Sequence, residues 1–306
     1  VNIKLLFSCK EYVNNLYKRR IFLVKSEIVW YMKFRNTKLA MITLSSFFIL
    51  GSASLSFTDT IHGEVASASA QEIIVKNYDD TYYNNAIGKT GLELKKELHN
   101  IIDNHTKLSY SAVWEALRDT DEDPNNKNNV ILLYTGRSQG KLTNGSGVNN
   151  WNREHVWAKS HGDFGTTAGP GTDLHHLRAT DVSVNSSRGN LDFDNGGVNH
   201  SEATECKYDS DSWEPRDSVK GDIARMLFYM AVRYEGDNGE IDLELNEKVN
   251  NNKDPYMGKL SVLLKWNEQD PVDDLERKRN EVIFTKYQHN RNPFIDHPEW
   301  VNKIWN

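Results

Sequence analysis

The sequence predicts an α+β fold, with one mostly helical domain that carries a few short strands. The chain has 306 residues, of which 38% are apolar, which is enough to fill the core of a large domain. Apolar residues recur at helical spacing in much of the chain, and the strand-like segments are short. Helices and strands do not alternate in the rhythm of βαβ units, and no repeat at solenoid periods is visible. This composition excludes a chain with many membrane spans.

The first seventy residues have the pattern of an export signal. Met32 opens a basic stretch, residues 39–50 carry no charge, and the small residues at 66–70 suit cleavage after Ala70. A permanent membrane anchor is the alternative, because residues 39–57 form a run of nineteen uncharged positions. We favour cleavage, and therefore expect a secreted, extracellular protein, with attachment to the cell surface left open.

These signals divide the chain into three parts. We expect an upstream extension without an assigned fold at 1–31, a signal peptide at 32–70 and the folded domain at 71–306. The whole chain has a net charge of −6, but residues 71–306 keep 28 basic and 39 acidic side chains and a net charge of −11. Cys206 is the single cysteine of this part, so no internal disulfide can form there. Any affinity for a polyanion must come from local basic groups and a metal ion.

Helical spacing marks the start of the domain. Leu94, Leu98 and their apolar neighbours predict a helix over 92–102. Ser111 is placed to cap a second helix that carries the apolar residues of 113–117.

A polar segment and a short apolar run come next. Residues 119–129 predict a solvated turn, and residues 130–134 a buried strand. Acidic residues at alternate positions of this turn leave an irregular calcium site open. A regular calcium hand is excluded, since Pro124 replaces the required glycine and Val130 the required glutamate.

The middle of the domain predicts the order strand, loop, strand, helix. The two strands are expected at 152–157 and 173–178, joined by a flexible Gly- and Thr-rich connector at 165–171, and the helix at 179–190. Three more helices are expected at 219–235, 259–268 and 271–289, the last of them opened by Pro271.

The same central segment concentrates the residue types that carry out chemistry. Five histidines fall within 46 residues, at positions 155, 161, 175, 176 and 200. The segment also contains Glu154, Asp173, Asn185 and two arginines, Arg178 and Arg188.

The order of these residues resembles the bacterial endonuclease I family of ββα-metal, or His-Me finger, nucleases. The core of the resemblance is Glu154-His155-Val156, Asp173-Leu174-His175, Val184-Asn185 and Arg188-x-Asn190. Later elements that match in order are Gly221–Arg225, Trp266-Asn267, Pro271–Asp273 and Asn292–Phe294. Residues 82–136 are similar to the secreted, cysteine-poor members that are described as extracellular ribonucleases. The resemblance covers nearly all of 71–306 and implies a ββα-metal core embedded in the helical domain.

The resemblance implies a role for each central residue. His155 is expected to take a proton from water as a general base. Glu154 and Asn185 are expected to hold one Mg²⁺, with Ca²⁺ or Mn²⁺ as alternatives, because oxygen ligands suit hard cations. Neighbouring strand residues point to opposite faces, so Glu154 and His155 can share a site only at a strand end or a distortion.

Two arginines are candidates for contacts with the phosphate, namely Arg188 and Arg178. Relatives with disulfides bring an arginine from the loop between the two strands, whereas residues 160–172 here contain no Arg or Lys. In this sequence that part of the loop between the two strands therefore offers no arginine or lysine side chain to the phosphate.

The function implied is a secreted, metal-dependent endonuclease that hydrolyses RNA, DNA or both with little sequence specificity. Water is the nucleophile in place of the 2′-hydroxyl, so both substrates are open to it and the products carry 5′-phosphates. We expect a monomer without stable membrane association after signal removal.

Two other functions stay open. One is a secreted nucleic-acid-binding protein without catalysis. The other is a zinc-dependent hydrolase that uses the clustered histidines, although no His-Glu-x-x-His pattern is present. Trp151, Trp157 and Trp213 are expected to pack in the core, with base stacking as the alternative.

Overall fold

The computed structural model describes residues 78, 79 and 81–306, which belong to one compact unit. The expected extension at 1–31 and signal peptide at 32–70 lie outside the described residues. Within the described part, no helix has both the length and the apolar character needed to cross a membrane.

Helices and short strands share the described chain, which makes the fold α+β. The helices are α3 (Gly91–Ile102), α4 (Val113–Thr120), α5 (Val182–Arg188), α6 (Lys220–Arg233), α7 (Leu260–Gln269), α8 (Asp274–Val282), α9 (Pro293–Asp296) and α10 (Trp300–Trp305). A 3-10 turn (Asp217–Val219) precedes α6, and a π-helical turn (Ile283–Tyr287) follows α8.

The strands form four small sheets in the described part of the chain. Antiparallel sheets are β1 (Glu122–Asp123), β2 (Asn126–Ile131) and β3 (Ser138–Gly140), and the pair β4 (Trp151–His155) and β5 (Leu177–Asp181). A mixed sheet has the order β6 (Asp192–Phe193), β9 (Ser212–Glu214), β8 (Lys207–Tyr208) and β7 (Val198–Asn199). The parallel pair is β10 (Glu244–Leu245) and β11 (Tyr256–Met257).

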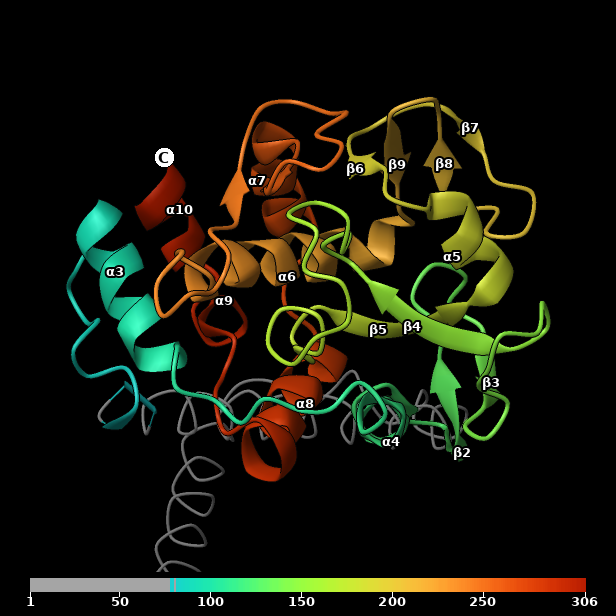
Figure 1. The fold of residues 1–306 in the computed structure, drawn as a ribbon, viewed down its shortest axis with the longest axis horizontal. Coiled ribbons are helices and arrows are strands. Elements are labelled where there is room, and N and C mark those ends of the chain that lie inside the picture. The colour runs from blue at the N-terminus through green and yellow to red at the C-terminus, as the bar shows by residue number, and fades with distance from the viewer. Residues whose placement is uncertain (1–77, 80) are drawn as a thin grey trace, which may run out of the picture. The chain divides into compact units, whose positions relative to one another are not determined.

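Helix α6 is the centre of the fold. Every one of its residues is buried, and it packs against α3, α7 and α9 (Figure 1). Ile223, Leu227 and Ala231 of this helix lie in the main hydrophobic core. Because other elements cover α6 on all sides, its polar residues are also buried and must find partners inside the protein.

The unit β4–β5–α5 lies beside α6 (Figure 1). The two strands pair antiparallel, with Glu154 opposite Arg178 and His155 opposite Leu177, and α5 follows β5 without a break. A second hydrophobic core packs beneath the pair and includes Trp151 and Leu177. The predicted order of strand, loop, strand and helix is therefore present, with shifted boundaries.

The shift of the second strand has a local cause. Residues 173–176 form a turn, because the Asp173 carboxylate accepts a hydrogen bond from the His175 amide at 2.9 Å. The Asp173 carbonyl accepts a second one from the Leu177 amide at 3.2 Å. An aspartate that bonds its own backbone competes with a strand, so β5 begins only at Leu177.

The polar segment at 119–129 is not the solvated turn that its composition predicts. It contains β1 and the start of β2, and Asp121 is buried. The Asp121 carboxylate accepts hydrogen bonds from Arg178, Arg279 and the Ala179 amide. These donors occupy the carboxylate that an irregular calcium site would need, so nothing in the geometry favours such a site here.

Two predicted helix starts are wrong by a few residues. Ser111 does not cap α4, where instead the Ser109 hydroxyl accepts from the Ala112 amide. Pro271 does not open α8, which begins at Asp274 behind a capping box formed by Asp273 and Glu276. In this box the Asp273 carboxylate accepts from the Glu276 backbone amide, and the Glu276 carboxylate accepts from the Asp273 backbone amide. Both amides lie at the start of the helix, where they have no carbonyl partner within it.

Candidate active site

A cavity of about 310 Å³ opens at the end of β4. Its lining includes Asn152, Glu154, His155 and Asn185, with Tyr110 and Lys159 at its sides. Three of the predicted site residues, Glu154, His155 and Asn185, are thus brought together. His155 is the last residue of β4, so the strand ends where two successive side chains must serve one site.

The His155 ring is held in one tautomer by the backbone. Its Nε2 lies 3.1 Å from the carbonyl oxygen of Gly171, and a carbonyl only accepts, so Nε2 carries the hydrogen. Burial lowers the pKa of His155 to about 3, and the neighbouring His176 ring and Lys159 ammonium act in the same direction. The imidazole is therefore neutral at pH 7, with the lone pair on Nδ1 free to accept a proton.

The loop that supplies the Gly171 carbonyl is a fixed structure. A Cβ atom at position 171 would come within 2.7 Å of the Gly165 carbonyl oxygen and 2.8 Å of the Thr166 Cα, so only glycine fits. The Thr172 amide donates to the Gly169 carbonyl at 2.9 Å. Residues 169–176 are all buried. The flexible connector expected at 165–171 is wrong for this part of the loop, which orients the imidazole.

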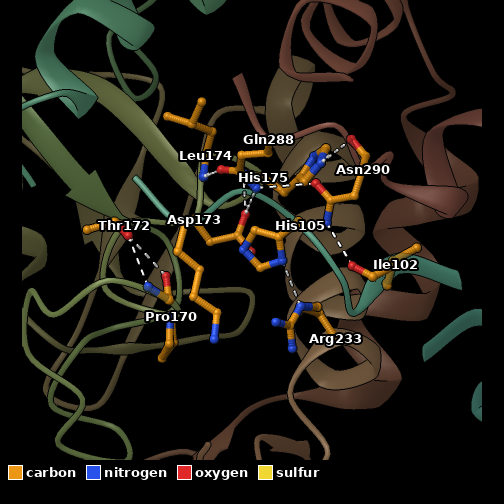
Figure 2. A network of polar contacts seen from close by, with 12 residues as sticks. Ile102, His105, Pro170, Thr172, Asp173, Leu174, His175, Arg233, Gln288 and Asn290 are labelled. Carbon is orange, nitrogen blue, oxygen red and sulfur yellow. Dashed lines mark hydrogen bonds and ion pairs between the residues drawn. The ribbon is translucent and has the colours of Figure 1, made fainter. Parts of the chain in front are cut away.

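Asp173, two residues beyond Gly171, ties the loop to the helices. Its carboxylate accepts hydrogen bonds from the hydroxyls of Tyr229 and Tyr234, each at 2.9 Å, and from the Gln288 amide at 2.9 Å. Figure 2 shows Asp173 between the Pro170–Thr172 segment and His105. Burial raises the pKa of Asp173, but His105, His175 and the hydrogen bond from Gln288 together lower it by more, so the pKa of Asp173 lies below its usual range.

Replacing Asp173 by asparagine is expected to lower the free energy of unfolding at pH 7 by about 3 kcal/mol, since hydrogen bonds to a buried charge are lost. A depressed pKa stabilises the fold above the unfolded-state value near ~3.9, so the difference from the unsubstituted protein should shrink as the pH falls below about 4. Urea unfolding at pH 7 and pH 3.5 measures both. Asp254→Asn is the matched control on an exposed carboxylate. If both substitutions lower the free energy of unfolding by the same amount, the hydrogen bonds to Asp173 do not stabilise the fold as proposed.

Glu154 keeps one carboxylate oxygen free. Its Oε1 accepts from the Tyr134 hydroxyl at 2.6 Å and lies 3.2 Å from Arg188 Nη1. Its Oε2 has no partner among the described residues, and Glu154 lines the cavity. Burial raises the pKa of Glu154, while Arg188 and the Tyr134 hydroxyl oppose this rise. A further positive charge at Oε2 would stabilise the ionised form.

Asn185, in the first turns of α5, also keeps one oxygen free. Its Nδ2 donates to Asn152 Oδ1 at 2.7 Å and to the Arg153 carbonyl at 3.4 Å. Both bonds use the amide nitrogen, so Oδ1 is left as an acceptor without a partner in the described chain. One carboxylate and one amide oxygen fit a hard divalent cation that keeps most of its coordination positions for water and phosphate.

The two predicted arginines have different positions. Arg188 is buried, and its Nη1 and Nη2 donate to the carbonyls of His155 and Val156 at 2.9 and 2.8 Å. It therefore holds the end of β4 and the Glu154 carboxylate in place. Arg178 is not brought to the cavity, because its guanidinium donates to Asp121 and Asp222. It lines a separate space of about 20 Å³, which has room for about one water molecule.

The other clustered histidines have structural partners. His161, His175 and His176 bond backbone carbonyls through a ring nitrogen, and His200 Nδ1 accepts from two backbone amides. Trp151, Trp157 and Trp213 are fully buried, which confirms core packing and leaves no ring face for a base.

One group of metal-binding side chains exists elsewhere in the described chain. His99, Asp103 and Asp237 could each offer a ligand atom, with these atoms within 4.8 Å of one another. Asp103 is already paired with Arg233 at 2.9 Å. The group includes none of the five clustered histidines, which weighs against a zinc site built from them.

Comparison with known proteins settles the family. The model of the endonuclease I family matches residues 90–299, about two thirds of the chain. The chain belongs to the endonuclease I family. An extracellular ribonuclease of Bacillus subtilis (strain 168) is 70% identical over 226 residues, which cover 74% of this chain and 78% of that protein. An extracellular ribonuclease of Bacillus amyloliquefaciens is 69% identical over 226 residues, with the same coverage.

Sequence reasoning missed several residues of this endonuclease I-family site. Tyr134 binds Glu154 from the end of an apolar run, and Gly171 positions His155 from a loop that looked flexible. Tyr110 and Lys159 line the cavity without a motif of their own. The sequence offered one signal for the role of Gly171, namely the many glycines between the two predicted strands. Glycines occur in flexible loops, but they also occur where two backbone segments approach closely.

Proposed function

We propose that this protein is a secreted, metal-dependent endonuclease that hydrolyses phosphodiester bonds of RNA and DNA. The observation that carries the proposal is the set of three atoms without a protein partner in the described chain: Glu154 Oε2, Asn185 Oδ1 and His155 Nδ1. The side chains of these three residues line one cavity. In this proposal, β4, β5 and α5 form a ββα-metal finger.

Glu154 Oε2 and Asn185 Oδ1 would hold one Mg²⁺, with Ca²⁺ or Mn²⁺ as alternatives. When bound, the ion supplies charge stabilisation at the scissile phosphate and at the departing oxygen. The Glu154 carboxylate is prepared for this role by Arg188 and Tyr134, which fix Oε1 and leave Oε2 to bind. Asn152 fixes the Asn185 amide in the same way, so neither ligand must reorganise on binding.

His155 acts as the general base. Its Nδ1 accepts a proton from a water molecule, and the water oxygen attacks phosphorus while the bond to the 3′-oxygen breaks. The Gly171 carbonyl accepts the Nε2 hydrogen throughout and so keeps Nδ1 as the accepting atom. The 3′-oxygen leaves with a proton from solvent, and the phosphate stays on the 5′-oxygen of the following nucleotide.

Nothing in this reaction requires a 2′-hydroxyl, so RNA and DNA are both substrates and the products carry 5′-phosphates. The extracellular ribonuclease names of the two relatives support RNA as a substrate and secretion as the destination. The protein acts as a monomer, without stable membrane association after signal removal. Attachment to the cell surface is the alternative location.

The test uses plasmid DNA and a defined RNA with Mg²⁺, Mn²⁺, Ca²⁺, Zn²⁺ or EDTA. We expect cleavage with Mg²⁺, a loss of at least 100-fold with EDTA, and recovery when Mg²⁺ is restored. Products should be substrates for a ligase that requires 5′-phosphates. A shift in the electrophoretic mobility of the nucleic acid without cleavage would favour a binding protein. Recovery of more activity with Zn²⁺ than with Mg²⁺ after EDTA treatment would favour a zinc hydrolase. Either result overturns the proposal.

A further inference from the structure

The proposed mechanism leaves the negative charge of the scissile phosphate without a protein cation. Arg178 donates to Asp121 and Asp222 and lies outside the cavity. Arg188 is buried, and its two terminal nitrogens donate to the carbonyls at the end of β4. Moving Arg188 to a phosphate would break these bonds and leave Glu154 without its ion pair.

Arg153 lines the cavity, but contacts with two aromatic rings and a backbone carbonyl hold its side chain in place. Its guanidinium carbon lies 3.4 Å from the centroid of the Tyr110 ring and 3.9 Å from that of Trp114, and Nη1 donates to the Tyr110 carbonyl. Burial lowers the pKa of Arg153, and the contacts with two rings fix the side chain. Arg153 contributes a fixed positive field, but it is not free to follow a phosphate.

Lys159 is the cation that remains at this cavity. It follows His155 by four residues, lines the same cavity and is exposed. Within the described chain its ammonium has no hydrogen bond or ion pair. Its charge is close enough to His155 to help depress the pKa of that ring. A lysine is a mobile point charge on a long flexible stem, which suits contact with an anion that arrives with the substrate.

We propose that the Lys159 ammonium contacts a non-bridging oxygen of the scissile phosphate and is a catalytic residue of this site. The inference rests on the proposed nuclease function. Lys159 takes the role expected of Arg178 and Arg188, which are both committed to holding the fold. Residues 160–172 of the loop between the strands contain no Arg or Lys, and Lys159 lies directly before them. Lys159 can therefore supply the positive charge that this part of the loop lacks.

The experiment measures kcat and KM for a defined single-stranded RNA with Mg²⁺ in the full chain and its variants. Lys159→Gln is expected to lower kcat by about 10- to 100-fold, because a charge contact made to the transition state is lost. Lys159→Arg should retain more activity than Lys159→Gln. Lys127→Gln is the matched control, since Lys127 is an exposed lysine of β2 without a partner in the described chain.

Chemical rescue separates a charge contact from a structural effect. Lys159→Cys treated with 2-bromoethylamine regains a side chain that ends in an ammonium, whereas iodoacetamide adds a neutral group of similar reach. We expect at least tenfold recovery of kcat with the first reagent and none with the second. Cys206 is buried, and burial raises its pKa to about 11, so it should stay unmodified, whereas any modification of Cys9 occurs equally in the unsubstituted protein. The unsubstituted protein, carried through both treatments, reports any other effect.

The outcomes distinguish the inference from the function on which it rests. If the unsubstituted protein cuts RNA with Mg²⁺ but Lys159→Gln keeps kcat within twofold, the role of Lys159 is overturned and the nuclease stands. A rise in KM of equal size in Lys159→Gln and Lys127→Gln, with kcat unchanged, reduces Lys159 to general attraction of a polyanion and also overturns the proposal. If the unsubstituted protein does not cut, both proposals fail together.

Discussion

Replacing His155 by alanine is expected to lower kcat by a factor of about 10² to 10⁴, the usual contribution of a general base. The loss arises because Nδ1 is the atom at this cavity that can accept a proton while its ring is held by the Gly171 carbonyl. Metal binding should change little, since the ligand oxygens belong to Glu154 and Asn185. The measurement is single-turnover cleavage of RNA at saturating Mg²⁺, with Mn²⁺ affinity measured in parallel.

His289→Asn is the control for this prediction. His289 is exposed, its backbone is left-handed at a φ of 63°, and asparagine tolerates that conformation. This variant should keep full activity. If His155→Ala cuts within tenfold of the unsubstituted protein, another group accepts the proton and the assigned mechanism is wrong.

Replacing Glu154 by glutamine is expected to lower activity by at least about 100-fold at millimolar Mg²⁺, because charge stabilisation by a bound ion contributes several kcal/mol. Glutamine keeps the shape and the acceptor for the Tyr134 hydroxyl, but it removes the negative charge that a cation needs. Part of the loss should be recovered at high Mg²⁺ concentration. A Mg²⁺ titration of the cleavage rate measures both effects.

Stability must be followed in the same variant, since Arg188 loses the charge of its partner. Urea unfolding separates a damaged fold from a damaged site, and Glu205→Gln serves as a control on an exposed glutamate. An unchanged Mg²⁺ requirement in folded Glu154→Gln would remove Glu154 from the metal site.

The sequence predicted α3, α4, α6 and α7 and the central order of strand, loop, strand and helix, because these depend on local patterns, but it predicted neither α9 nor α10. The helix expected at 219–235 corresponds to α6, and the strand expected at 152–157 corresponds to β4, which ends two residues earlier at His155. The start of β5 was predicted wrongly, because the Asp173 carboxylate binds the His175 amide and turns the backbone there. Capping of α8 by Asp273 was hidden by the nearby proline, although both signals are local.

The site was predicted where one ordered motif carries it and missed where distant segments meet. Glu154, His155 and Asn185 lie within one supersecondary unit, so their order in the chain was informative. The roles of Arg178 and Arg188 could not be predicted from this order. They depend on partners elsewhere in the chain, which are Asp121 and Asp222 for Arg178 and the end of β4 for Arg188. A free cation such as Lys159 is recognised only after the others have been matched to their partners in three dimensions.

The central claim is that Glu154 and Asn185 share one divalent cation beside His155. Crystals of the protein grown with Mn²⁺ test it through the anomalous scattering of the metal. We expect one strong peak in the cavity, about 2.0 to 2.3 Å from Glu154 Oε2 and from Asn185 Oδ1. A peak at His99, Asp103 and Asp237 with none in the cavity would contradict it.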